Sequence, residues 1–153
     1  MSQLEKPVLS DADVYRMVRS QIEFEDGLIT QRLSWFVAAQ SFLFTAYAIN
    51  LTGAWTGLAP ELKLQRRLLF DVVPIVAIAS CMLIYFGILA GVAAQKKLRD
   101  LLCRLIPADR REMFPGIHGT GSTRMFGMAA PLGLPPVFIT VWLVLLVRGM
   151  TMF

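Results

Sequence analysis

The chain has 153 residues, of which 56% are hydrophobic and 17% are charged, and its formal net charge is +4. This length allows one compact domain, and charged residues are too sparse for an ordinary soluble domain. One histidine and two cysteines in unrelated contexts exclude a metal cluster and a disulfide framework, so we expect no metal and no cofactor.

The first 32 residues include many charged residues and no long apolar run, which argues against a cleavable signal peptide. Ser10, followed by Asp13, resembles a capping box at the start of a helix. Apolar residues then recur at near-helical spacing, and Arg19 and Glu23 can pair on the other face. We predict a cytoplasmic amphipathic helix over residues 10–32.

Residues 33–52 carry no charge and are long enough to cross a bilayer as a first span. Small and hydroxyl residues recur there at steps of four and three, which places them in one stripe along the helix. In lipid, such a stripe lets another helix approach closely or faces water. The stripe consists of Ser34, Ala38, Ser41, Thr45, Ala48 and Thr52.

The second uncharged run covers residues 72–95, and an amphipathic pattern extends this span to residue 106, before Pro107. Gly87 and Gly91 form a G-x-x-x-G pair, which predicts close helix packing. Residues 128–148 form the third predicted span, with an irregular entry because prolines interrupt its beginning.

Residues 107–127, between the second and third spans, form a predicted Gly- and Arg-rich cytoplasmic loop. Its sequence from Gly116 to Thr123 resembles a phosphate-binding loop, but Ser122 replaces the required lysine and no strand precedes it. One alternative is that the loop binds an anionic lipid or a nucleotide without being a phosphate-binding loop of this kind. The other is that the positive charge of the loop only sets the topology of the protein in the membrane. The candidate ligand residues are Arg110, Arg111, His118, Gly119, Gly121 and Arg124.

The predicted fold is therefore all-α. Residues 1–153 form one integral membrane domain with three spans, an N-terminal amphipathic helix and a cytoplasmic extension of the second span. In this arrangement eleven Lys and Arg residues lie on the side of the N-terminus and four on the other side. The positive-inside rule then places the N-terminus in the cytoplasm.

The segment from Arg32 to Ala48, RLSWFVAAQSFLFTAYA, resembles small bacterial multi-span membrane proteins, some of which look like anti-phage effectors. The resemblance implies a bacterial inner membrane and no assigned activity.

No catalytic or specific nucleic-acid motif is evident, so we do not expect an enzyme. The first hypothesis is a homo-oligomeric channel or pore-forming effector, gated through its cytoplasmic basic regions. The alternative is a non-conducting assembly or regulatory subunit of a larger membrane complex.

Overall fold

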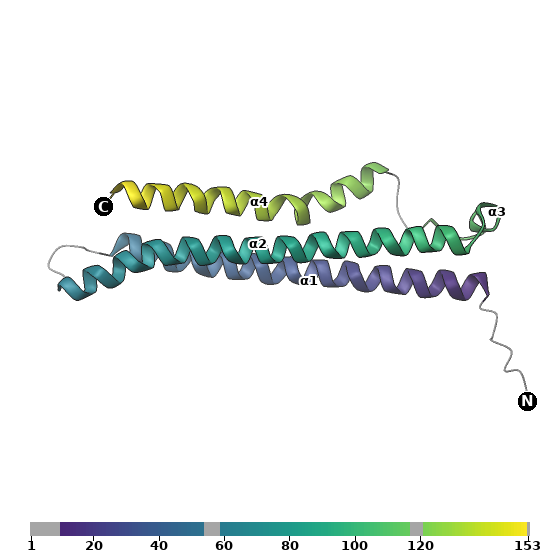
Figure 1. Ribbon diagram of the computed structural model, residues 1–153, viewed down its shortest axis with the longest axis horizontal. Coiled ribbons are helices and arrows are strands. Elements are labelled where there is room, and N and C mark those ends of the chain that lie inside the picture. Colours follow the sequence, from purple (N-terminus) through teal and green to yellow (C-terminus); the bar gives the residue numbers. More distant parts are fainter. Residues whose placement is uncertain (1–9, 54–58, 117–120, 153) are drawn as a thin grey trace, which may run out of the picture.

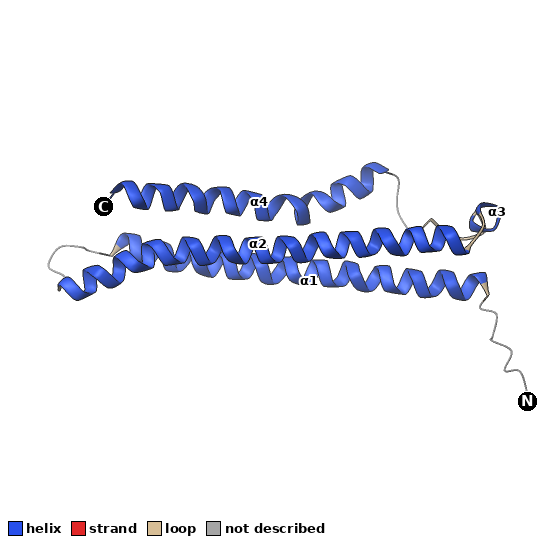
Figure 2. Cartoon of the chain, in the orientation of Figure 1, coloured by secondary structure: helices blue, strands red, loops and turns tan. Residues whose placement is uncertain are grey.

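The computed structural model describes residues 10–53, 59–116 and 121–152, with the side chains of 121–126 and 151–152 outside that description. The described chain folds into helices α1 (Asp11–Thr52), α2 (Pro60–Leu105), α3 (Ala108–Arg111) and α4 (Gly121–Met152). Figure 2 shows that the regular elements in this described part are all helical, which confirms the predicted all-α class.

Helix α1 is one continuous helix of 42 residues, so the predicted amphipathic helix and the predicted first span are not separate elements. The predicted start is confirmed, because Ser10 caps the helix by accepting a hydrogen bond from the Asp13 amide at 3.2 Å. No proline interrupts α1, and the single glycine at Gly27 costs only about 1 kcal/mol, which packing along α2 offsets.

Helix α2 begins at Pro60, which needs no amide partner in the first turn of a helix, and continues without a break to Leu105. Pro74 therefore lies inside the helix rather than in its first turn, because the helix starts well before the predicted span. The predicted helical continuation as far as residue 106 is confirmed: α2 ends beside Pro107, with the Ile106 amide donating to the Leu102 carbonyl at 3.0 Å.

Helix α4 starts at Gly121, inside the predicted loop 107–127, and runs through Pro131, Pro135 and Pro136. A helix can continue through proline when it bends, and the first turns of α4 bend away from α2 (Figure 1). The irregular entry predicted for the third span is therefore a bent helix.

The helices lie side by side, with α2 in the middle: α1 and α2 form a long antiparallel pair, and α4 runs antiparallel along α2 (Figure 1). Buried residues of α2 recur every seven positions, the repeat of a coiled coil, and α1 contributes matching buried residues. The principal heptad positions of α2 are Pro74, Cys81, Ile88, Gln95 and Leu102.

The buried residues form two separate clusters, and each cluster defines one region of the molecule. The three-helix region comprises residues 33–52 of α1, 70–86 of α2 and 127–150 of α4, and its core contains Phe36, Phe70 and Trp142. The two-helix arm comprises residues 11–32 of α1, 87–105 of α2 and α3, and its core contains Tyr15 and Ile22.

Two helical segments in the described residues are long and apolar enough to cross a membrane: α2, and residues 127–150 of α4. They indicate membrane association. The predicted first span is not one of them, because polar residues such as Gln40 and Asn50 lower its hydropathy; the structure thus does not confirm three spans.

Candidate functional site

The small-residue stripe of α1 lies on the outside of the three-helix region. All six members are exposed, whereas Phe36, Gln40 and Tyr47 on the opposite side of α1 are buried. At 3.6 residues per turn, the stripe and the buried face lie about half a turn apart on the helix. The stripe is therefore available to a partner outside this chain.

Each hydroxyl of the stripe is bound to the backbone of α1 itself. Ser34 donates to the Thr30 carbonyl at 3.0 Å, and Ser41 donates to the Val37 carbonyl at 2.9 Å. Thr45 and Thr52 donate in the same way, one turn back along the helix. Because these donors are satisfied, the stripe tolerates a dry contact with another helix as well as water.

Behind the stripe, one buried polar cluster joins the three helices. The Gln40 amide nitrogen donates to Ser80 Oγ at 2.9 Å and to the Ala77 carbonyl at 3.4 Å. The Gln40 carbonyl accepts a hydrogen bond from Trp142 Nε1 at 2.7 Å. Gln40 and Trp142 are fully buried, so these bonds fix the register of α1, α2 and α4 without water.

Aromatic rings close the space around this cluster. Phe44 stacks on Trp142 with ring centroids 4.3 Å apart, and Tyr47 meets the same indole edge-on at 5.7 Å. Phe138 packs edge-on against Phe36 at 5.2 Å. The space around this cluster is therefore packed with side chains, and a water path along the stripe would have to lie outside this chain.

The G-x-x-x-G pair of α2 faces α1 within the same chain. The Gly87 carbonyl accepts a hydrogen bond from Arg32 Nη1 at 2.9 Å. A methyl group on Gly91 would lie 3.1 Å from Ile29 Cγ1, which is a tight contact, whereas one on Gly87 would lie 3.7 Å from Arg32 Cδ. The two glycines thus allow α1 and α2 to approach closely where the arm begins.

The predicted anion-binding residues are only partly brought together. Arg110 pairs with Asp11 at 3.0 Å and so ties α3 to the start of α1. Arg111 donates to Cys103 Sγ at 3.0 Å. His118 and Gly119 lie outside the described residues, and Gly121 opens α4. The side chain of Arg124, also in α4, is not described.

Arg111 lines a cavity of about 260 Å³ at the tip of the arm, together with Arg99 and Phe114. Tyr15 closes this cavity: its ring stacks on Phe114 at 4.8 Å, and its hydroxyl donates to the Pro115 carbonyl at 2.8 Å. The arrangement gives the tip two guanidinium groups over an apolar floor, which suits an anion with an apolar part.

Charged side chains and exposed apolar residues such as Phe24 share the outside of the arm. Arg19 donates to Glu23 at 2.8 Å, and this hydrogen bond raises the pKa of the exposed Arg19 guanidinium. Inside the arm, Gln95 donates to Asp26 Oδ1 at 2.6 Å and so joins α1 to α2. The arm therefore has a mixed surface of ion pairs and apolar side chains on the outside and a polar link between α1 and α2 inside.

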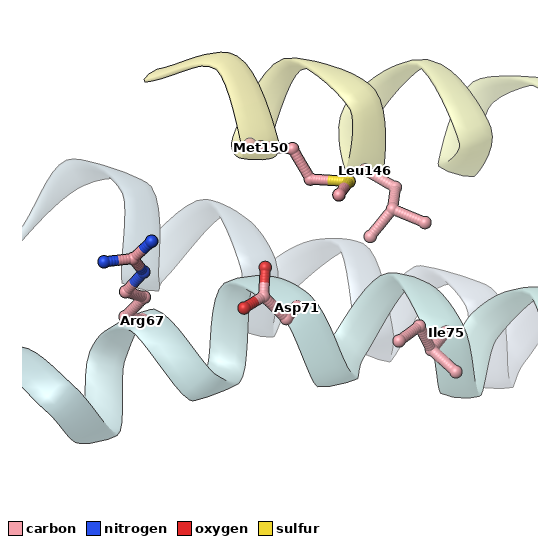
Figure 3. A pocket seen from close by; sticks show the side chains of 6 residues that line it. Arg67, Asp71, Ile75, Leu146 and Met150 are labelled. Carbon is pink, nitrogen blue, oxygen red and sulfur yellow. The ribbon is translucent and has the colours of Figure 1, made fainter. Parts of the chain in front are cut away.

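A second cavity, of about 460 Å³, lies between α2 and α4 at the opposite end of the molecule from the arm. Arg67 and Asp71 of α2 line it together with Leu146 and Met150 of α4, which point towards α2 (Figure 3). The sequence predictions assigned no site to these residues. An Arg and an Asp one helical turn apart, beside the start of an uncharged run, are the signal that would have drawn attention to them.

The sequence predictions also missed Gln40, Gln95 and Trp142. The seven-residue repeat of α2 was the available signal, since Gln95 occupies one of its positions. No comparable signal marks Trp142, because its partner Gln40 lies 102 positions earlier in the chain.

Comparison with protein-family models, curated proteins and solved structures finds no match to this chain. The resemblance of residues 32–48 to small bacterial membrane proteins therefore stays a prediction.

Proposed function

We propose that the protein is a homo-oligomeric channel of the bacterial inner membrane, with three spans per copy and with the α1 stripes lining a path between copies. The observation that carries this proposal is the position of the stripe. It faces away from α2 and α4, and large apolar residues such as Leu83 and Val147 are exposed on those two helices instead. A row of small residues on an outer face is typical of helix association in lipid.

Membrane insertion is supported by where the apolar residues lie. Only 22% of the apolar window of α2 and 17% of that of α4 are buried, whereas the core helix of a soluble protein would be mostly buried. Large side chains such as Leu83 and Val147 point outwards, and the burial of polar Gln40 reverses the pattern of a soluble domain. Lipid is the solvent that matches such a surface.

The third proposed span is residues 33–52 of α1. Its two most polar side chains, Gln40 and Asn50, are buried and hydrogen-bonded to α2, so neither faces lipid. Its outer face then carries the stripe, flanked by exposed Trp35 and Phe42. Satisfied polar groups of this kind are tolerated within a bilayer.

The orientation follows from charge. The arm and its basic tip carry most of the Lys and Arg residues, and the positive-inside rule places them in the cytoplasm together with the N-terminus. The tip cavity with Arg99 and Arg111 would be the place where a cytoplasmic anionic lipid or nucleotide affects gating.

The alternative is a non-conducting assembly or regulatory subunit. One observation favours it: the stripe hydroxyls are satisfied by their own helix, so they need no water. In that case the stripe is a dry seam that packs on the helices of another protein.

Cysteine substitution separates the two functions. Ser41, Thr45 and Thr52 are changed singly to Cys in a Cys81→Ala, Cys103→Ala background, with Phe42→Cys as an exposed control on the neighbouring side of α1. For a channel, the stripe cysteines react with a water-soluble thiol reagent, Phe42→Cys does not, and modification changes ion flux in liposomes, because thiolates form where water reaches.

If the α1 stripe instead packs on the helices of another protein without water, the labelling result is different. Unreactive stripe cysteines in an oligomer that conducts no ions would overturn the channel. The alternative then requires a second protein that purifies with the chain and is lost from a Thr45→Leu variant. A monomer that conducts nothing and purifies alone contradicts both functions.

A further inference from the structure

The cavity between α2 and α4 joins a charged end to an apolar wall. Asp71 is half-buried and points from α2 towards α4, while Leu146 and Met150 come down from α4 on the other side (Figure 3). Ile75 continues the apolar wall one turn further along α2. A methyl group on Gly149 would meet nothing within 4 Å, so this glycine leaves the entrance open.

The two charges of this cavity are available to a ligand. Within the described residues, neither Arg67 nor Asp71 makes a hydrogen bond or ion pair, although they lie one helical turn apart on α2. One group offers planar donors that suit a phosphate, and the other offers an acceptor that suits an ammonium group. Their arrangement complements a zwitterion.

The level of the cavity relative to the proposed membrane fits a lipid headgroup. Arg67 and Asp71 directly precede the uncharged run of α2, and Gly149 and Met150 follow the predicted end of the third span. In the proposed membrane orientation this is the level of the headgroups on the outer side. An acyl chain leaving the charged end would run along Ile75 and Leu146 into the bilayer core.

We propose that this cavity binds a phospholipid with a primary ammonium headgroup, phosphatidylethanolamine, with its phosphate on Arg67 and its ammonium on Asp71. The proposal rests on the membrane insertion proposed above. A quaternary ammonium headgroup cannot donate a hydrogen bond to Asp71, and an anionic headgroup would be repelled by its carboxylate. The site should therefore distinguish phosphatidylethanolamine from both phosphatidylcholine and phosphatidylglycerol.

Native mass spectrometry of the full chain, purified from membranes in detergent, tests this selectivity. The three lipids, with identical acyl chains, are added in turn and the bound fraction is measured. We expect phosphatidylethanolamine to be retained about fivefold better than phosphatidylcholine, the equivalent of one net hydrogen bond that only the primary ammonium can donate to Asp71.

Three variants separate the parts of the site. Asp71→Leu should abolish the preference over phosphatidylcholine because it removes the hydrogen-bond acceptor. Arg67→Gln should weaken both lipids alike, and Gly149→Leu should exclude all three by filling the entrance. Glu61→Gln and Lys63→Gln are matched controls, because both residues are exposed near the start of the same helix and lie outside the cavity.

Equal retention of the three lipids, a preference for phosphatidylglycerol, or an unchanged preference in Asp71→Leu would overturn the lipid site. The same spectra count the subunits. A monomer that still prefers phosphatidylethanolamine would contradict the proposed oligomer and leave the lipid site standing.

Discussion

The three-helix region and the two-helix arm are built on the same α1–α2 seam, but their outer faces carry different side chains. In the three-helix region Gln40 is buried and Phe42 and Leu83 are exposed. In the arm Ile22 is buried, and the Arg19–Glu23 pair lies on the surface. A heptad seam can therefore carry different outer faces along its length, because the seam fixes only the inner face of each helix.

Helix α4 explains how Gln40 remains buried in the three-helix region. Trp142 of α4 reaches the seam at Gln40 and satisfies its carbonyl, which α2 alone leaves free. Among the side chains that the structure describes, none of α4 belongs to the core of the arm, and the seam there is closed at the tip by the stacking of Phe114 on Tyr15. The predictions below test this division.

The largest effect is expected from Trp142→Ala in the three-helix region. Removing a fully buried indole leaves a cavity and should lower the free energy of unfolding by about 3–5 kcal/mol. Trp35→Ala is the matched control, because this indole is 71% exposed, and it should change stability by less than about 0.5 kcal/mol. Denaturant unfolding in detergent measures both; equal losses would contradict the packing of α4 on the seam.

Ile22→Ala should destabilise the arm by about 2–5 kcal/mol, since Ile22 is 2% exposed in its core. Phe24→Ala, at a 61% exposed position, is the control. Amide hydrogen exchange should show faster opening of the arm and unchanged protection of residues 33–52. Loss of protection along the whole of α1 would mean that the two regions unfold as one unit.

Gln40→Leu should cost about 1–3 kcal/mol, because the buried Trp142 Nε1 and Ser80 Oγ lose a partner. Combining it with Trp142→Phe should cost less than the sum of the single changes, since the second change removes the stranded donor. Additive costs in this double-mutant cycle would show that the hydrogen bond contributes nothing to stability.

The smallest effects are expected at the glycines where the regions meet. Gly87→Ala should stabilise the chain by up to about 1 kcal/mol, because alanine favours helix and its methyl group has room. Gly91→Ala should not stabilise the chain in this way, since its methyl group would lie only 3.1 Å from Ile29 Cγ1. Thermal unfolding compares the two; the same shift for both would show that Ile29 moves aside freely.

Much of the architecture could be predicted from sequence, because it depends on local chemistry. Ser10 capping the first helix, Pro107 ending the second and the long uncharged runs are visible in short windows, and the structure confirms the cap, the end of α2 and two apolar helices. The division between residues 10–32 and 33–52 was wrong as a helix boundary, since a change of surface polarity does not interrupt backbone hydrogen bonds.

The amino-acid sequence by itself determined that the chain is helical, where its apolar segments lie and which residues form the stripe. Only the tertiary structure decided which side of each helix is buried. Gln40 meets Trp142, Gly91 meets Ile29 and Asp71 faces α4 because α1, α2 and α4 adopt one register. That register arises from packing and hydrogen bonds between distant residues, for which the local spacing of apolar residues carries no information.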